Sequence, residues 1–257
     1  MSMVGSDGRT GSTTGAPGGR PHHRPSLRTR RAGAVLAAGL LLGGGLAACG
    51  SSGSSTTTTG SGSSGSGAAL ATSSRATMTG LTSFRVTGTI TSSSQHTTLD
   101  LVLTPTTSGG TITTSQGPFQ LISDGTHAYL SATSAFWTNQ GVPAAAAATL
   151  AGRWVTGFPA AETKTLTKSL DVKQLLGPLY TGPVTAQGTT TVAGQQAHAL
   201  RATDGSTAYI AATGPPYLLQ VSSPDNGAQG KVTFSEFGSA TPPAVPTGAI
   251  DISTVKG

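Results

Sequence analysis

Apolar and polar residues alternate along several short segments of the chain from residue 84 onward. In FRVTGTIT (84–91) and TLDLVLT (98–104), most of the large apolar residues stand two positions apart. A period of two is typical of a strand with one buried face. The same features continue in GTITTS, PFQLIS and HAYLSA, with an Asp124-Gly125 turn before the last of these segments. These five segments predict an antiparallel meander.

The pattern changes before and after this meander. ALATSSRATMT (69–79) predicts a weak helix, and the Ala-rich middle of the chain has helical apolar spacing. Asp171 is expected to cap a short helix, VKQLL, that ends at Gly177-Pro178. Strands then resume in TTTVAG, QQAHALRA, STAYIAA, YLLQVSS and GKVTFSEF, before a Pro-containing tail that we expect to lie outside the sheet. Strands, helices and strands again predict one α+β domain over residues 69–257, an antiparallel sheet with helices on one side.

The chain ahead of this body has the parts of a secretory signal. Six arginines precede the uncharged run Ala32–Ala48, which ends in small residues before Cys49. A transmembrane helix is the alternative, but it needs about 20 apolar residues, whereas this run has 17 and contains five glycines.

The single cysteine of the chain follows directly. Leu46-Ala47-Ala48-Cys49 resembles the lipobox of bacterial lipoproteins. This resemblance implies a signal peptide over residues 1–48 and cleavage before Cys49. It also implies a diacylglycerol, with acyl chains such as palmitate, joined to the Cys49 sulfur by a thioether. Residues 50–68 consist almost entirely of Ser, Thr, Gly and Ala, so we expect them to form a disordered tether. A G-x-G-x-x-G match at Gly60–Gly65 lies within this tether, without the preceding strand that a nucleotide site requires.

The net charge of +6 arises mainly from the signal region. After Cys49, nine basic residues stand against eight acidic ones, a net charge of +1. Binding of a polyanion needs a basic patch on the folded domain. The sequence therefore predicts no nucleic-acid partner.

No motif of catalysis or metal binding is present in the body. The sequence has no G-x-S-x-G elbow, and its one cysteine is the predicted lipidation site. His96, His127 and His198 do not fall into a metal-ligand spacing. A serine triad assembled from distant residues stays open, since sequence spacing does not constrain one. We expect a protein that is not an enzyme and needs no metal or cofactor.

The order of features resembles the LppX/LprG-type lipoproteins of actinobacteria, which are related in fold to the periplasmic lipoprotein carrier LolA. The resemblance covers residues 70–257. The stretches that carry it are the strand pair 84–103, Asp124-Gly125 before HAY, AFW ahead of GRWV, VAGQQ, AYIA and Pro215-Pro216. It implies a strongly curved antiparallel half-barrel sheet, with helices that cover the concave face and enclose an apolar cavity for acyl chains.

On this basis the alternating residues would face the cavity, together with leucines of the covering helices. The candidate cavity-lining residues are Phe84, Val86, Ile90, Leu99, Leu101, Leu103, Leu170, Leu175 and Leu176. Trp137 and Trp154 are the candidates for the cavity mouth.

The resulting hypothesis is an exported lipoprotein, anchored by Cys49 to the outer face of the cell membrane, that binds or carries acylated lipids or glycolipids. A membrane transporter is a further candidate partner. The alternative is an anchored interaction module of the cell envelope, with a solid core and no lipid cargo. The scarcity of large apolar residues favours the alternative, and the helices beside the sheet favour the carrier.

Overall fold

The computed structural model describes residues 64–92, 95–180, 182–224 and 228–254. All of them belong to one compact unit, Ala32–Gly257. Cys49, the predicted signal peptide and most of the predicted tether lie outside the described residues.

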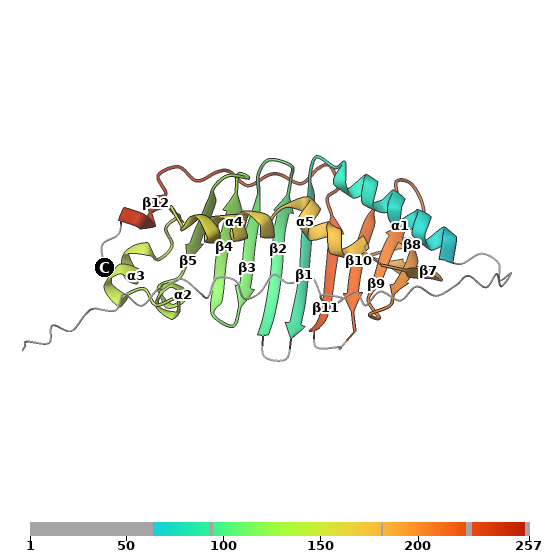
Figure 1. Ribbon diagram of the computed structural model, residues 1–257, viewed down its shortest axis with the longest axis horizontal. Helices are drawn as coiled ribbons and strands as arrows, with labels where there is room; N and C mark the ends of the chain where they lie inside the picture. Colours follow the sequence, from blue (N-terminus) through green and yellow to red (C-terminus); the bar gives the residue numbers. More distant parts are fainter. Residues whose placement is uncertain (1–63, 93–94, 181, 225–227, 255–257) are drawn as a thin grey trace, which may run out of the picture. The chain divides into compact units, whose positions relative to one another are not determined.

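Twelve strands in the described part of the chain form one sheet (Figure 1), in the order β12-β6-β5-β4-β3-β2-β1-β11-β10-β9-β8-β7. The strands are β1 Phe84–Ser92, β2 Gln95–Leu103, β3 Ser108–Thr114, β4 Gly117–Ser123, β5 Ala128–Ala132, β6 Val155–Thr156, β7 Val184–Val192, β8 Gln195–Ala202, β9 Thr207–Ala211, β10 Leu218–Ser223, β11 Ala228–Ser235 and β12 Ile250–Asp251. Neighbouring strands are antiparallel except β12 and β6, which are parallel. The predicted α+β class with an antiparallel sheet is confirmed.

The sheet consists of two meanders that meet at their first and last strands. Strands β1 to β5 follow one another in space, as do β7 to β11. Strand β1 pairs with β11 over eight residues, from Arg85 opposite Ser235 to Ser92 opposite Ala228. This long-range pairing joins the two halves into one continuous surface.

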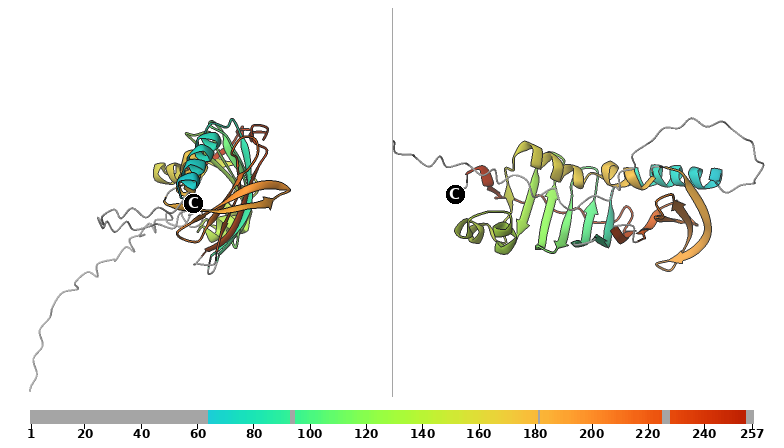
Figure 2. Two further views of the ribbon diagram at one scale, coloured as in Figure 1. Left: turned by 90° about the vertical axis from the view of Figure 1, so that its right-hand side faces the viewer. Right: turned by 60° about the horizontal axis from the view of Figure 1, so that its bottom comes forward.

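The helices of the described residues lie on the concave side of this curved sheet and at one of its ends (Figures 1 and 2). They are α1 Ser64–Thr79, α2 Ser134–Asn139, α3 Ala144–Leu150, α4 Ala160–Ser169 and α5 Val172–Leu176, with 3-10 turns at Gly177–Tyr180 and Ile252–Thr254. Helix α1 contacts β7 and α5, and α4 contacts β5. Helices α2 and α3 pack on each other beside β4 and β5 (Figure 1). The predicted cover of helices over the concave face is therefore present.

The alternation seen in the sequence determines which face of the sheet is buried. In the β1–β2 register, Phe84 lies opposite Leu103 and Val86 opposite Leu101, so these side chains share one face. The alternation in β1 skips Gly88, where an added Cβ would collide with the backbone oxygen of Lys231. Glycine at this point lets β11 approach β1 closely.

Two predicted boundaries were wrong. Helix α1 begins at Ser64, so residues 64–68 are helical and not part of the tether. Gly67 is buried, and a Cβ added there would lie within 3.5 Å of the backbone of Val184 and Ala186. Packing on β7 thus extends the helix into a Ser/Gly segment of low helix propensity. The tail also returns to the sheet, since Ile250 pairs with Val155.

Candidate functional site

The candidate cavity-lining residues gather in one apolar cluster between the sheet and the helices. Eight of them, all but Ile90, are at most 6 % exposed. Ile90 is half-buried and packs against the same cluster. Leu170 is the C-cap of α4, while Leu175 and Leu176 come from α5, so both helix segments contribute to the cluster. We refer to the side of the sheet formed by the six strand residues of this set (Phe84, Val86, Ile90, Leu99, Leu101 and Leu103) as the covered face. The structure thus brings all nine candidate residues into one cluster. That they line a lipid cavity stays a prediction.

The two tryptophans lie toward the α2–α3 end of the sheet. Trp137 in α2 is 2 % exposed and meets Phe136 edge-on, with ring centroids 5.6 Å apart. Phe136 in turn lies 5.2 Å from Phe119 of β4. Trp154 is half-buried just before β6. Trp137 belongs to the core cluster, and the role of both residues at a cavity mouth stays a prediction.

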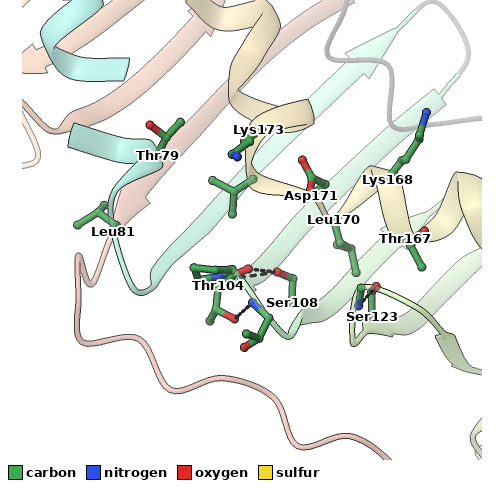
Figure 3. A pocket seen from close by; sticks show the side chains of 14 residues that line it. Thr79, Leu81, Thr104, Ser108, Ser123, Thr167, Lys168, Leu170, Asp171 and Lys173 are labelled. Carbon is green, nitrogen blue, oxygen red and sulfur yellow. Dashed lines mark hydrogen bonds between the residues drawn. The ribbon is translucent and has the colours of Figure 1, made fainter. Parts of the chain in front are cut away.

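A pocket of about 320 Å³ lies at the ends of strands β2, β3 and β4, where α4 meets α5 (Figure 3). We call it the rim pocket. One wall is the β2–β3 turn, another is the end of β4, and the break between the two helices closes the opposite side. The lining residues are Thr79, Leu81, Thr104, Pro105, Thr106, Ser108, Ser123, Gly125, Thr167, Lys168, Leu170, Asp171, Val172 and Lys173. The pocket thus combines hydroxyls, two lysines and a few apolar side chains.

The helix break beside the pocket has a local cause. Helix α4 ends at Ser169 with Leu170 as its C-cap, and α5 starts at Val172, so only Leu170 and Asp171 lie between the two helices. The Asp171 carboxylate accepts a hydrogen bond of 2.8 Å from the amide of Gln174 and so caps α5. This is the N-cap predicted from the sequence. The residues of this break, Leu170 and Asp171, line the pocket together with Val172 and Lys173.

Leu170 is the only residue of the predicted lining set in this pocket. Sequence reasoning missed Thr104, Ser108, Ser123, Lys168 and Lys173, because polar residues in turns and at helix ends have no periodicity. The one available signal was Asp171, whose capping position marks where the helical cover is interrupted.

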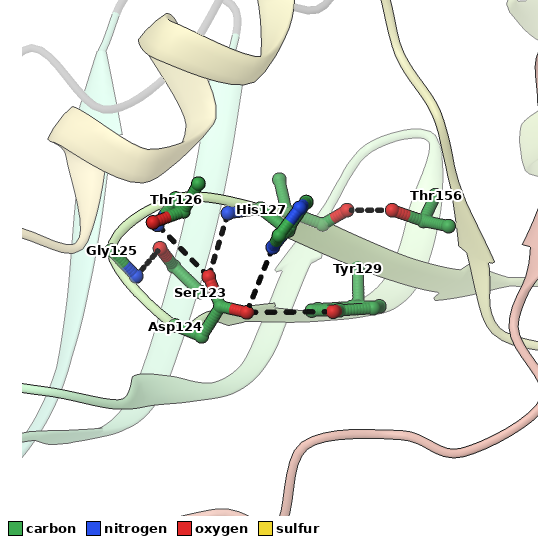
Figure 4. Close-up of polar contacts among 8 residues, drawn as sticks. Ser123, Asp124, Gly125, Thr126, His127, Tyr129 and Thr156 are labelled. Carbon is green, nitrogen blue, oxygen red and sulfur yellow. Dashed lines mark hydrogen bonds and ion pairs between the residues drawn. The ribbon is translucent and has the colours of Figure 1, made fainter.

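A polar cluster occupies the β4–β5 turn next to the pocket (Figure 4). One oxygen of Asp124 accepts hydrogen bonds from the amides of Thr126 and His127, and the other lies 3.0 Å from Nδ1 of His127. Burial acts to raise the pKa of Asp124, but these hydrogen bonds outweigh it and the pKa is lowered. Burial and the charge of Asp124 raise the pKa of Tyr129.

These contacts stabilise the turn and do not assemble a catalytic triad. Ser123 accepts a hydrogen bond from the amide of Gly125 at 3.0 Å, and among the described residues the Nδ1 of His127 is paired with Asp124 and not with Ser123, so this turn does not form the nucleophile–base hydrogen bond of a serine hydrolase. Within residues 64–254, apart from the undescribed gaps, no three His, Cys, Asp or Glu side chains come together as metal ligands. In the same residues no helix has the length and apolarity needed to cross a bilayer.

Comparison with known proteins identifies the fold. No protein-family model and no curated protein matches the chain. The structure is similar to that of LprF from Mycobacterium bovis, with a TM-score of 0.53 and 14 % identity, over 73 % of this chain and 99 % of that one. It is also similar to the Mycobacterium tuberculosis lipoprotein LppX, with a TM-score of 0.46 and 14 % identity, over 69 % and 97 % of the two chains.

A more distant similarity is to a LolA superfamily protein from Nitrosomonas europaea, with a TM-score of 0.27 and 8 % identity, over 71 % of this chain and 96 % of that one. The likeness to LprF shows a shared fold. The predicted fold, an antiparallel half-barrel sheet with helices over its concave face, is confirmed by this likeness.

Proposed function

We propose that this protein binds or carries acylated lipids, with the acyl chains held between the covered face and helices α1, α4 and α5. The observation that supports this most is the continuous apolar cluster on the concave side of the sheet. Short helices cover it, and the two of them that follow each other, α4 and α5, are interrupted at Leu170 and Asp171. Burial of an acyl chain stabilises a complex by about 0.8 kcal/mol per CH₂. The mechanism is then the non-covalent shielding of the lipid's acyl chain from water.

Membrane anchoring is the second part of this proposal. It rests on Leu46–Cys49 and on the Ser/Thr/Gly-rich segment that follows. A diacylglycerol on Cys49 would hold the protein on the outer face of the cell membrane, where a carrier can reach lipid. The likeness to LppX, which is described as a lipoprotein, is consistent with this location.

The lipid proposal can be tested by native mass spectrometry of the full-length protein from a lipid-containing host. Non-covalent lipid is present in native spectra and lost under denaturing conditions, whereas a lipid on Cys49 persists in both. We expect discrete non-covalent adducts on the wild type. Leu101→Trp, which places a large ring on the covered face, should abolish them while the protein remains folded by circular dichroism.

Val102→Trp is the matched control, because neighbouring residues of a strand point to opposite faces. Val102 is half-buried on the side of β2 away from Leu101, so this variant should keep its adducts. A wild type without adducts would contradict the lipid proposal.

The second candidate is an anchored interaction module with a solid core. It is favoured by the complete burial of Leu101, Leu103 and Leu176, each 0 % exposed. In a solid core, Leu101→Ala leaves a cavity and costs about 2–5 kcal/mol, and Leu101→Trp overpacks and unfolds the protein. A clean apo mass together with an unfolded Leu101→Trp variant would support this module.

A further inference from the structure

The β2–β3 turn that forms one wall of the rim pocket satisfies its own polar groups. The amide of Thr104 donates to Oγ of Ser108 at 3.1 Å, and the Ser108 hydroxyl donates to the carbonyl of Thr104 at 3.0 Å. The Thr104 hydroxyl donates to the carbonyl of Thr107 at 2.6 Å. The side chains of Thr104 and Ser108 are buried. This wall shapes the pocket and offers no hydroxyl hydrogen from Thr104 or Ser108 to an occupant.

The opposite wall carries the charge. Lys168 from the last turn of α4 and Lys173 from α5 line the pocket and are exposed. Neither lysine forms an ion pair within the described residues. Asp171 lies between them, and its Oδ1 is occupied as the cap of α5. Two cations against one anion give this lining a net charge of +1.

Ser123 adds a buried donor from the end of β4. Its side chain is among the buried polar groups, at 3 % exposed, and its oxygen accepts the hydrogen bond from Gly125. The hydroxyl hydrogen has no acceptor within the described part of the chain. A buried hydroxyl with an unused donor, at the wall of a pocket, is suited to an oxygen-rich occupant.

The apolar side of the pocket is continuous with the covered face. Leu170 lines the pocket, is 1 % exposed and belongs to the same cluster as Leu101 and Leu103. A molecule with its polar end in the pocket would therefore have its apolar end at Leu170, next to the covered face.

We propose, on the premise of the lipid-binding function above, that the rim pocket receives the phosphate-bearing headgroup of an anionic lipid. Lys173 and Lys168 supply the positive charge, and the Ser123 hydroxyl donates to a phosphate oxygen. In Figure 3 the Lys168 amine extends away from Thr104, and its exposed, flexible stem lets it turn toward a bound anion. At about 320 Å³ the pocket stands at the lower end of ligand pockets, which favours a compact headgroup.

The test compares two lipids with identical oleoyl chains, phosphatidic acid and diacylglycerol, offered as an equimolar mixture to the full-length protein. Native mass spectrometry gives the ratio of the two adducts. We expect the wild type to prefer phosphatidic acid about tenfold, since hydrogen bonds to charged groups are the stronger ones. Lys168→Gln/Lys173→Gln should lose most of this preference and keep its diacylglycerol adduct.

Lys164→Gln/Lys231→Gln removes the same charge from exposed residues that do not line the pocket, and it should keep the preference. Ser123→Ala, which changes no charge, should lower the preference by a few fold. An equal preference for phosphatidic acid in the two double variants would overturn the headgroup proposal. Equal binding of both lipids to the wild type would also overturn it while leaving the lipid-binding function intact.

Two further outcomes distinguish a lipid headgroup from free phosphate, and the headgroup proposal from the lipid-binding function on which it rests. Binding of neither lipid to the wild type would contradict the lipid-binding function itself. Inorganic phosphate, tested alone by thermal shift, should leave the melting temperature unchanged at millimolar concentration. A shift that disappears in Lys168→Gln/Lys173→Gln would assign the pocket to free phosphate and overturn the lipid assignment.

Discussion

At the scale of single residues, Trp137 is a buried side chain whose one polar atom has no hydrogen-bond partner in the described part of the chain. Its indole N–H has no acceptor within the described residues, and a buried unpaired donor costs about 1–3 kcal/mol. Trp137→Phe removes this donor along with part of the ring. Since the two effects oppose each other, we expect the free energy of unfolding in urea to change by less than about 1 kcal/mol. Trp137→Ala should lose about 3–5 kcal/mol, because it opens a large cavity. A Phe variant as unstable as the Ala variant would show that the N–H has a partner.

The residue scale also separates what the sequence predicts from what it leaves out. Leu99, Leu101 and Leu103 were identifiable because alternation places them on one face, and burial follows from that face. Lys168, Lys173 and Ser123 were not, since they meet only when a helix end, a second helix and a strand end come to one point. No local pattern encodes such a meeting.

At the scale of elements, an ion-pair network ties three strands together on the face away from the core. Arg85 of β1 donates two hydrogen bonds of 2.8 Å to the carboxylate of Asp100 in β2 and one of 3.0 Å to Glu236, just after β11. The hydrogen bond from Arg85 is the main reason that the pKa of Asp100 is lowered. The folded state therefore binds this proton less readily than the unfolded state does.

The sign of the pH effect follows from this lowered pKa. Ionised Asp100 stabilises the fold above its unfolded pKa of about 4, and this stability is lost as the pH falls through the lower folded value. We expect the melting temperature of the wild type to fall more steeply below about pH 4 than that of Asp100→Asn. The difference should be small, because the pair is exposed and screened. Glu162→Gln, which removes a carboxylate without an ion pair in the described residues, should follow the wild-type curve.

Elements with a regular pattern were predictable, and those that depend on distant partners were not. Strands β1 to β5 and the capped helix α5 carry their signals in their own residues. Strands β6 and β12 have two residues each, too few for any periodicity, and exist because Ile250 pairs with Val155. Helix α1 likewise extends to Ser64 by contact with β7 and not by propensity.

At the scale of the whole molecule, the sequence predicts an antiparallel sheet with helices on one side but not the order of its strands. Alternation shows which face of β1 is buried, while the choice of β11 as its neighbour is made by the complete chain. This pairing joins the two halves into the one sheet whose covered face lies beneath α4 and α5. A carrier function belongs to this scale, because no single element encloses a lipid.

The anchor is the last property of the whole molecule, and it can be tested apart from cargo binding. Cys49→Ala removes the sulfur to which a diacylglycerol would be attached. One acyl chain holds a protein on a membrane only marginally, whereas two hold it stably, so we expect the variant to move from the membrane fraction to the soluble fraction by more than about tenfold. Ser51→Ala, two residues away, leaves the thiol in place and should stay in the membrane fraction. Because Cys49 is not among the residues proposed to hold the acyl chains, the released Cys49→Ala protein should still carry non-covalent lipid. Retention of the Cys49→Ala protein in washed membranes would contradict the lipobox, whatever the result for cargo.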